Sequence, residues 1–454
     1  MINQQALIRK YNVPGPRYTS FPTVPYWDTN SFSSKKWKQS VFEAFQKTNE
    51  EGMAIYIHLP FCESLCTYCG CNTRITVNHK VEDPYITAVL KEWQLYLDIF
   101  KSAPAIKEIH LGGGTPTFFS PENLKFLING LLQNCTISEN AEFSFEGHPN
   151  NTTEVHLQTL FDLGFRRVSF GIQDFDPKVQ KIINRIQTFE QVEKVVSQAR
   201  KIGYTSINFD LIYGLPLQTN KSVIETIEKV KLLRPDRIAF YSYAHVPWIK
   251  PGQRKFTEVD LPADEVKRQL YETGKQMFSE EGYHEIGMDH FALPSDSLFK
   301  AMTDKNLHRN FMGYTHQSTK MMIGLGVSSI SDTWNAFAQN VKKVEEYYSI
   351  LEKGELPVFK GHFHSPEDLV LREHILDIMC RFNTSWNEAE KQFSFVDQTR
   401  EILKEIASDD LIIMEENAIW LKDEARPFVR NICMAFDSYL LRNAPSTTIF
   451  SSTV

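Results

Sequence analysis

The sequence predicts an α/β protein with a partial or full (β/α) barrel of parallel strands. Short β-branched and aromatic runs recur, a stretch with helical i, i+3, i+4 apolar spacing follows each run, and polar or glycine residues stand at the run ends. Six strand and helix units in a row favour a parallel sheet, either doubly wound or closing toward a barrel. The predicted strands are IYIHLP from 55, EIHLGGG from 108, EFSFEG from 142, RVSFGIQ from 167, INFDLIYG from 207 and RIAFYSYA from 237.

The composition is that of a globular, slightly acidic protein. Of 454 residues, 42% are apolar, and 49 Lys and Arg face 56 Asp and Glu, giving a formal charge of −7. This charge argues against a general nucleic-acid or anionic-membrane binder, because both collect phosphate groups with a basic field. The start has no apolar signal core, and no later stretch approaches 18 uninterrupted apolar residues, so we expect a cytoplasmic protein with no membrane segment.

We expect three parts along the chain. Residues 1–50 carry turn-forming residues before one predicted helix, and are expected to form an N-terminal extension over the barrel mouth. Residues 51–364 would form the barrel, with strand-like pieces between 282 and 345 that either extend or cap its sheet. Residues 365–454 predict a small, mostly helical C-terminal domain with one strand pair in LIIMEENAIWLK.

Four of the seven cysteines lie within ten residues, directly after the first predicted strand. Cys62, Cys66, Cys69 and Cys71 have the spacing C-x3-C-x2-C-x-C. A structural zinc site is one interpretation. We favour an iron–sulfur cluster, because zinc sites usually pair two separated knuckles, whereas these four thiols crowd one loop. If three thiolates hold a [4Fe-4S] cluster, one iron stays free to bind a substrate or cofactor.

A glycine run, Gly112-Gly113-Gly114-Thr115-Pro116, ends the second predicted strand. Glycines let the backbone approach a ligand closely. The run matches neither the G-x-x-x-x-G-K-[ST] phosphate loop nor the G-x-G-x-x-G dinucleotide pattern, so nucleotide binding by those routes is not predicted. Barrel active sites lie where the carboxyl ends of the strands meet. Later strands end there in Glu146, Gln173, Asp210 and Ala244.

The cysteine loop resembles that of the radical S-adenosylmethionine (SAM) superfamily, in which the open iron chelates SAM. The glycine run is similar to a motif of the same superfamily, and Tyr68 fits the aromatic residue that lies beside adenine there. A packing aromatic is an equal alternative for Tyr68. Between residues 8 and 442 the chain resembles one family of that superfamily, the oxygen-independent coproporphyrinogen III oxidases. The matching segments are KYNVPGPRYTSFPT at 10–23, YCGCN, HLGGGTPT, GIQDF, NFDLIYGLP, YAHVP, GMDHFA, HRNFMGYT and RNICMAFDSYL.

The resemblance implies an oxidoreductase of heme and porphyrin biosynthesis. Two propionates of coproporphyrinogen III would become vinyl groups without O2, giving protoporphyrinogen IX. A 5′-deoxyadenosyl radical from a [4Fe-4S] cluster and SAM would break an unactivated C–H bond, which acid and base side chains cannot do. The family also implies two SAM molecules per active site, a reducing donor such as flavodoxin or ferredoxin, and a monomer.

The resemblance assigns the cofactor residues by motif. Cys62, Cys66 and Cys69 would ligate the cluster. Tyr56, Glu146 and Cys71 are also catalytic candidates; Cys71 would serve radical chemistry or substrate positioning, or is simply a buried thiol. The first SAM would contact Tyr56, Gly113, Glu146 and Ile330, and the second Tyr68, Gly114, Thr115, Gln173, Arg185, Asp210 and Ala244.

Chemistry independently supports two of these assignments. Asp210 could accept hydrogen bonds from ribose hydroxyls, and Arg185 could pair with the SAM carboxylate. A capping Asp and a surface Arg are the alternatives, since charges on loops are usually solvated. After Glu146 the chain reads Gly147-His148, where the resemblance predicts a hydrophobic residue followed by Asp or Asn. This departure predicts a local difference in the backbone there.

A substrate with four carboxylates requires a local basic pocket within an acidic protein. The substrate-binding candidates are Arg17, His290, His308 and Arg309, with Tyr18 and Arg430 as further members of the same group. Dispersed histidines are more often structural. The rival functions are a radical SAM-related heme chaperone and an anaerobic heme-degrading enzyme, and both Cys71 and the RNIC segment count against them.

Overall fold

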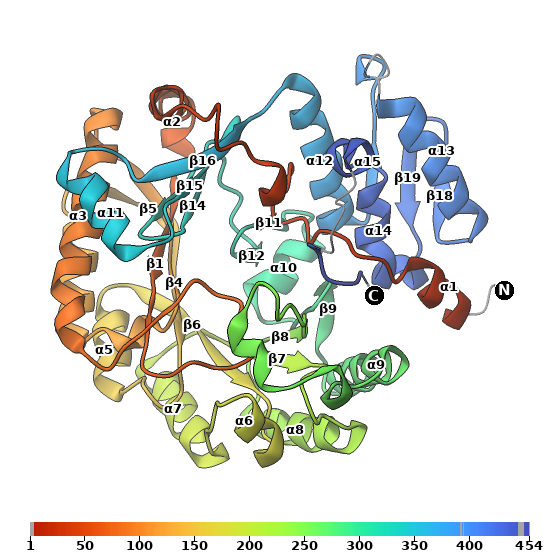
Figure 1. The fold of residues 1–454 in the computed structure, drawn as a ribbon, viewed down its shortest axis with the longest axis horizontal. Helices are drawn as coiled ribbons and strands as arrows, with labels where there is room; N and C mark the ends of the chain where they lie inside the picture. Colours follow the sequence, from red (N-terminus) through yellow and green to blue (C-terminus); the bar gives the residue numbers. More distant parts are fainter. Residues whose placement is uncertain (1–3, 391–392, 394, 444–448, 454) are drawn as a thin grey trace.

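Parallel strands form the centre of the protein in the computed structural model, which describes residues 4–390, 393, 395–443 and 449–453 (Figure 1). Each predicted strand is present, and one more joins the parallel set from later in the chain. In spatial order the strands are β13 (Met322–Leu325), β1 (Met53–Leu59), β4 (Ala105–Gly113), β5 (Thr136–Gly147), β6 (Phe165–Gln173), β7 (Ser206–Tyr213) and β8 (Arg237–Ser242). The predicted α/β class is confirmed.

Amphipathic helices connect these strands and cover the outside of the sheet (Figure 1). They are α3 (Glu82–Phe100), α4 (Pro121–Leu132), α5 (Glu154–Asp162), α6 (Pro177–Ile182), α7 (Phe189–Ile202), α8 (Asn220–Leu233) and α9 (Asp264–Glu280). Thr153, Thr188 and Thr219 begin three of them with capping boxes, which satisfy amide groups that a helix start leaves free. Helix α7 ends at Gly203, whose φ of 117° suits a left-handed cap. The capping residues therefore begin and end these helices where the packing against the sheet requires them.

The parallel strands turn apolar side chains outward and polar side chains inward. On β5, Phe143 and Phe145 are buried in the apolar core, while Glu142, Ser144 and Glu146 alternate with them. A strand sends successive side chains to opposite faces. The register then places His110 opposite Ser144 and Ser144 opposite Arg167. Polar rows therefore run across the inside of the barrel.

Antiparallel strands extend the sheet at both edges, so the barrel is partial. On one side lie β10 (His290–Ala292) and β9 (His284–Gly287), and on the other β14 (Ile330–Asp332), β15 (Ala336–Asn340) and β16 (Val358–Phe363). The segment predicted between 282 and 345 extends the sheet and does not cap it. Along the part of the chain described here, the sheet stays open between its two edge strands, β16 and β9, because β10 occupies the free edge of β8.

The C-terminal segment packs around a second apolar core (blue in Figure 1). Its elements are α12 (Pro366–Arg381), β17 (Asn383–Ser385), α13 (Phe395–Ser408), β18 (Ile412–Met414), β19 (Ala418–Leu421), α14 (Val429–Met434) and α15 (Ser438–Arg442). The predicted strand pair is β18 with β19, and β17 completes a three-stranded sheet. The division of the chain at residues 50 and 364 stays a prediction. No helix among the described residues is long and apolar enough to cross a bilayer.

From residue 4 onward, the N-terminal segment contains two α-helices, α1 (Gln4–Tyr11) and α2 (Ser34–Thr48), whereas the sequence predicts one. Helix α2 packs against α3 and contributes Trp37 and Phe45 to the barrel core. Helix α1 instead joins the C-terminal core, where the Tyr11 ring lies 5.4 Å from that of Phe428. Eight residues form a marginal helix on their own. Tertiary packing, which local periodicity does not report, stabilises α1.

The two ends of the chain are held together by Arg430 on α14. Its guanidinium donates to the carbonyl oxygens of Pro16 (2.8 Å), Ser452 (2.7 Å) and Gly15. Thr453 is buried beside them, and its hydroxyl donates to the Val13 carbonyl (2.9 Å). The Arg430 guanidinium is therefore occupied by backbone carbonyl groups, whereas the sequence placed Arg430 among the substrate-binding candidates.

We expect Arg430→Leu to destabilise the protein by about 3 kcal/mol, because the variant leaves buried carbonyl groups without donors. The thermal midpoint should fall by several degrees. Arg442→Leu is the control, since Arg442 makes an ion pair with Glu367 through a side chain that is 57% exposed, and such pairs contribute less than about 1 kcal/mol. Equal midpoints for both variants would contradict this role.

Candidate functional site

The cysteine loop is held at both ends by backbone pairing. Strands β2 (Phe61–Cys62) and β3 (Arg74–Ile75) run parallel and close the loop between them. At its middle, the Thr67 amide donates to the Ile183 carbonyl (2.9 Å), and the Asn184 side chain donates to the Leu65 carbonyl (2.8 Å). The loop therefore lies against the end of α6, over the carboxyl ends of the parallel strands.

A cavity of about 520 Å³ opens beneath this loop, at the carboxyl ends of β4 to β8. It brings together most of the predicted site. The lining residues include Cys62, Cys66, Tyr68, Cys69, Cys71, Gly113, Gly114, Thr115, Glu146, Gln173, Arg185 and Asp210, with His110, His148, Ser169 and Tyr241 beside them. Polar residues predicted at separate strand ends thus share one concave surface, where barrel active sites are built.

The four thiols differ in environment. Burial raises the pKa of Cys62 to about 11, although Thr115 contacts its sulfur at 3.4 Å. A hydrogen bond from the Cys71 thiol, helped by the Cys71 amide, lowers the pKa of Cys69 to about 6. Arg185 approaches the Cys66 sulfur at 3.6 Å. Cys71 is exposed and acts on Cys69 as a donor.

This donor set fits a cubane cluster. In the described chain, no three His, Cys, Asp or Glu side chains converge closely enough to hold a single metal ion. A zinc site needs every sulfur within about 2.3 Å of one point, whereas a cluster binds each cysteine at a different iron. Three thiols spread around one cavity suit the second arrangement.

The glycine run leaves no room for side chains beside the cysteine loop. A Cβ atom on Gly114 would lie 2.7 Å from the Pro60 carbonyl, and one on Gly112 would lie 3.0 Å from both Glu146 and Tyr56. Gly113 has a φ of 116°, a conformation that favours glycine. The run therefore lets the loop and Glu146 approach the β4 backbone; its predicted close approach to a ligand stays a prediction.

Glu146 is fixed by β4. Its carboxylate accepts the Gly113 amide (3.2 Å) and lies 3.5 Å from His110 Nε2, while His110 Nδ1 contacts the Ser144 hydroxyl (2.8 Å). Desolvation raises the pKa of Glu146, but the hydrogen bonds from His110 and Gly113 outweigh it and lower that pKa below its ordinary value. Glu146 is therefore an anion at neutral pH.

Gln173 and Arg185 also line the cavity. Gln173 is buried with a φ of 66°, and its side-chain oxygen has no partner in the described structure. A buried acceptor without a donor is unfavourable and indicates a ligand donor. Arg185 donates twice to the Gly171 carbonyl (2.6 and 3.2 Å), so these two nitrogens are already engaged.

Asp210 lies deeper, between β6 and β8. Its carboxylate accepts Ser169 Oγ and Asn208 Nδ2, each at 2.9 Å. Burial, the largest cause, and the charge of Glu146 raise the pKa of Asp210 to about 7. Its charge therefore changes within the physiological range.

Three predicted SAM residues lie outside the cavity lining. Tyr56 stands behind it, with its ring 6.0 Å from that of His110 and its hydroxyl 3.1 Å from His58 Nδ1. The Ala244 carbonyl accepts Gln253 Nε2 (3.3 Å), which also donates to the Tyr68 carbonyl (3.1 Å). Ile330 begins β14 and packs its backbone against Gly324. Their contacts with SAM stay predictions.

The substrate candidates also lie outside that lining, near β10 and β11 (His308–Asn310). Arg17 pairs with Asp289 (3.0 Å). Burial lowers the pKa of His290 to about 3 and that of His308 to about 4, so both rings are neutral. Arg309 is buried.

The departure after Glu146 has a steric cause. A Cβ atom on Gly147 would lie 2.9 Å from Thr152 Oγ1 and 3.0 Å from the Phe170 ring. A hydrophobic side chain at 147 would therefore displace the packing that this chain has. His148 lines the cavity and accepts the Asn150 amide (3.1 Å).

Four further residues of the site are not predicted by the sequence: His110, Ser169, Asn208 and Tyr241. All four lie at inward positions of parallel strands, one or more residues before the strand ends where the predicted site residues gather. The signal that could have found them is alternation: polar residues at every second position of strands whose other positions are apolar.

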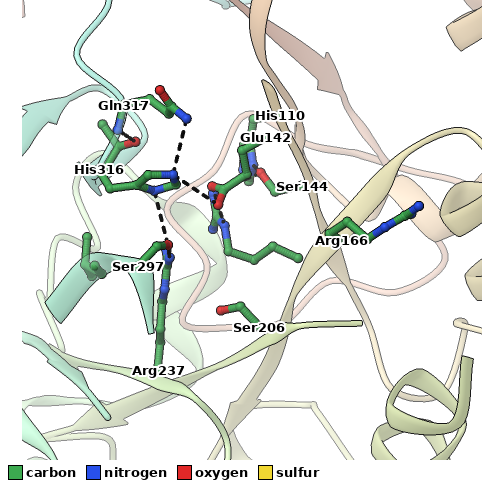
Figure 2. A network of polar contacts seen from close by, with 12 residues as sticks. His110, Glu142, Ser144, Arg166, Ser206, Arg237, Ser297, His316 and Gln317 are labelled. Atoms are coloured by element: carbon green, nitrogen blue, oxygen red, sulfur yellow. Dashed lines mark hydrogen bonds and ion pairs between the residues drawn. The ribbon is translucent and has the colours of Figure 1, made fainter. Parts of the chain in front are cut away.

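A buried ionic network lies below the cavity. Arg167 Nε donates to Glu142 (2.9 Å), and Arg237 Nε donates to Asp296 (2.6 Å). Figure 2 shows His316 between Ser297, Gln317 and Glu142, with Arg237 reaching Ser297. Arg167 also donates to Ser144 (3.0 Å), which contacts His110. The network thus continues up to Glu146.

Comparison with known proteins assigns the family. The model of the radical SAM superfamily matches residues 56–230. The chain is 38% identical over 447 residues to the oxygen-independent coproporphyrinogen III oxidase of Escherichia coli (strain K12), covering 97% of this chain and 96% of that protein. The chain belongs to the oxygen-independent coproporphyrinogen III oxidases. The Helicobacter pylori (strain ATCC 700392 / 26695) oxidase is 39% identical and covers 95% of each chain.

A solved structure supports the same family. The E. coli coproporphyrinogen III oxidase, described as a radical SAM enzyme, superposes with a TM-score of 0.89 at 35% identity, over 96% of this chain and 99% of that one. As a member of the radical SAM superfamily, this oxidase uses a [4Fe-4S] cluster and SAM. The thiols, the glycine cradle and the unpaired Gln173 oxygen described above fit these two groups.

We expect Gly114→Ala to lower the iron content of the anaerobically reconstituted protein severalfold, because the new Cβ atom forces the Pro60 backbone and the cysteine loop away from β4. Iron per chain and cluster absorption measure the effect. Gly70→Ala is the matched control in the same loop, since a Cβ atom there meets nothing within 4 Å. Full iron content in both variants would show that the close approach is not required.

Proposed function

We propose that this protein is an oxygen-independent coproporphyrinogen III oxidase of heme and porphyrin biosynthesis. It converts two propionates of coproporphyrinogen III to vinyl groups and yields protoporphyrinogen IX. Each propionate loses one hydrogen atom, one CO2 and one electron. The observation that supports this most is the cavity in which three cluster-spaced thiols face the glycine run, Glu146 and Asp210, in a chain related to these oxidases over nearly its whole length.

When bound, the reduced cluster and SAM supply a 5′-deoxyadenosyl radical, which can take hydrogen from an unactivated carbon. The residues of the chain hold and orient these groups. Cys62, Cys66 and Cys69 hold the cluster, and Gly113 and Gly114, which line the cavity without side chains, leave room for the SAM amino acid portion. The Glu146 anion binds the ammonium of one SAM, and Asp210 accepts the ribose hydroxyls of the other.

The remaining SAM contacts follow the resemblance. We assign Tyr56, Gly113, Glu146 and Ile330 to one SAM and Tyr68, Gly114, Thr115, Gln173, Arg185, Asp210 and Ala244 to a second. The unpaired Gln173 oxygen supports the second set, because it needs a donor from a ligand. Cys71 acts by donating to Cys69.

The partners follow the same proposal. A low-potential donor such as flavodoxin or ferredoxin reduces the cluster, and the protein works as a monomer in the cytoplasm. The formal net charge of −7 does not favour nucleic acid. The heme chaperone and the heme-degrading enzyme lack support, since the relatives compared above are coproporphyrinogen oxidases.

Anaerobically reconstituted protein with SAM, a reductant and coproporphyrinogen III should form protoporphyrinogen IX and 5′-deoxyadenosine, measured by chromatography. Cys62→Ala should abolish both products and the brown cluster absorption. Cys135→Ala is the control, because Cys135 follows α4, where its thiol bonds to the Leu131 carbonyl (3.0 Å). Heme binding without product, or a colourless zinc-containing protein, would overturn the proposal.

The Asp210 carboxylate should make SAM binding depend on pH. Its pKa is raised to about 7, so it is charged above that pH and neutral below it. Ribose hydroxyls bind the charged form more strongly, and SAM affinity should fall about tenfold between pH 8 and pH 6. Asp210→Asn should bind SAM more weakly at pH 8 and lose this dependence. Calorimetric titration at several pH values measures the SAM affinity. If the affinity of Asp210→Asn depends on pH as that of the parent protein does, Asp210 is not the titrating group.

A further inference from the structure

A buried guanidinium beside the cavity lacks most of its hydrogen-bond partners. Arg309 on β11 is 6% exposed, and its Nε and Nη1 atoms have no partner in the described part of the chain. Its Nη2 donates to the Arg17 carbonyl (3.2 Å). A buried charge without a counter-ion is strongly unfavourable, so its retention indicates an anionic ligand.

His290 lies in the same enclosure. The Arg309 guanidinium stacks over the Tyr314 ring at 4.5 Å, and the His290 ring meets the Tyr314 ring edge-on at 5.3 Å. His290 Nδ1 is also buried and without a partner among the described residues, while Nε2 lies 3.4 Å from the Tyr241 hydroxyl. If the hydroxyl donates to Nε2, the neutral ring carries its proton on Nδ1 and offers a second donor.

The surroundings are positive. The nearby carboxylate of Asp289 is already paired with Arg17. The pKa of His290 is lowered by burial first and then by Arg309, Arg237 and Arg17, which shows that cations dominate the field there. One guanidinium charge is thus left over, and a single carboxylate would neutralise it.

This enclosure adjoins the main cavity. Tyr241, which contacts His290, lines that cavity, and so does Met312, in the turn between β11 and β12 (Gly313–Thr315). A molecule that fills the cavity can therefore reach Arg309 with a short flexible acidic arm. A propionate is an arm of that kind.

We propose that Arg309, assisted by His290, binds one propionate carboxylate of coproporphyrinogen III, and that this propionate is one of the two that remain in the product. The inference rests on the proposed function. Loss of CO2 converts a carboxylate into a neutral molecule, so an ion pair with a buried guanidinium stabilises the reactant and opposes decarboxylation. The pair therefore suits an anchoring propionate and not a reacting one.

The test uses Arg309→Met, which keeps a long apolar stem and removes the charge. Fluorescence titration with coproporphyrin III, the stable oxidised form, should show affinity weaker by about 10- to 100-fold. Protoporphyrin IX, which keeps only the two surviving propionates, should lose affinity by a similar factor. SAM affinity and substrate-free SAM cleavage should not change. Arg381→Met, which removes a partly exposed arginine of α12, is the control and should bind both porphyrins normally.

Stability separates this role from a structural one. An unpartnered buried charge destabilises the ligand-free fold, so the thermal midpoint of Arg309→Met should equal or exceed that of the parent protein. Arg309→Lys should restore part of the porphyrin affinity. Unchanged coproporphyrin binding in Arg309→Met would overturn the assignment. So would a lowered thermal midpoint in Arg309→Met together with loss of porphyrin binding in Arg309→Lys.

Two further outcomes are distinguishable. If coproporphyrin III binding depends on Arg309 but protoporphyrin IX binding does not, Arg309 holds a reacting propionate and the anchoring role is wrong. If the parent protein makes no protoporphyrinogen IX, the proposed function itself fails, whatever the variants bind.

Discussion

Charge inside the barrel is the constraint on which the rest of the structure depends. Parallel strands must give alternate side chains to the interior, and here those positions hold Glu142, Arg167 and Arg237. Buried charges are costly unless they are paired, and removing one partner of such a pair costs about 3–5 kcal/mol. The pairs Arg167–Glu142 and Arg237–Asp296 meet this condition. The first pair joins β5 to β6, and the second joins β8 to the start of α10 (Ser297–Thr303).

The functional site is continuous with these inward-facing polar side chains. Arg167 bonds to Ser144, Ser144 contacts His110, and His110 lies against Glu146. The side chains that face the cavity are therefore the last members of a network that begins in the barrel floor. A cofactor site needs side chains held in place before the ligand arrives. The glycine run then brings the cysteine loop within reach of this fixed layer.

The strands, their helices and the strand-end residues could be predicted because they obey local periods of 2 and 3.6 residues. Gly113, Glu146, Gln173 and Asp210 all line the cavity, since strand ends of a parallel sheet meet at one edge. Helix α1 could not be predicted, because Tyr11 is stabilised by Phe428, more than 400 residues away. The inward positions of His110 and Ser169 follow strand alternation, but only the register shows that they touch Glu146 and Asp210.

Arg309 and Arg430 show why residue type alone does not identify a binding site. Both are buried arginines, 6% and 4% exposed, in segments that suggest substrate binding from the sequence. Arg430 donates to backbone carbonyls from both chain ends, so its hydrogen-bonding capacity is used by the fold. Within the described residues, Arg309 has one acceptor, and its Nε and Nη1 atoms have no partner. A structural arginine therefore differs from a ligand-binding one in how many of its N–H donors already have acceptors in the protein. Those acceptors are carbonyl groups from distant parts of the chain, which the local sequence does not reveal.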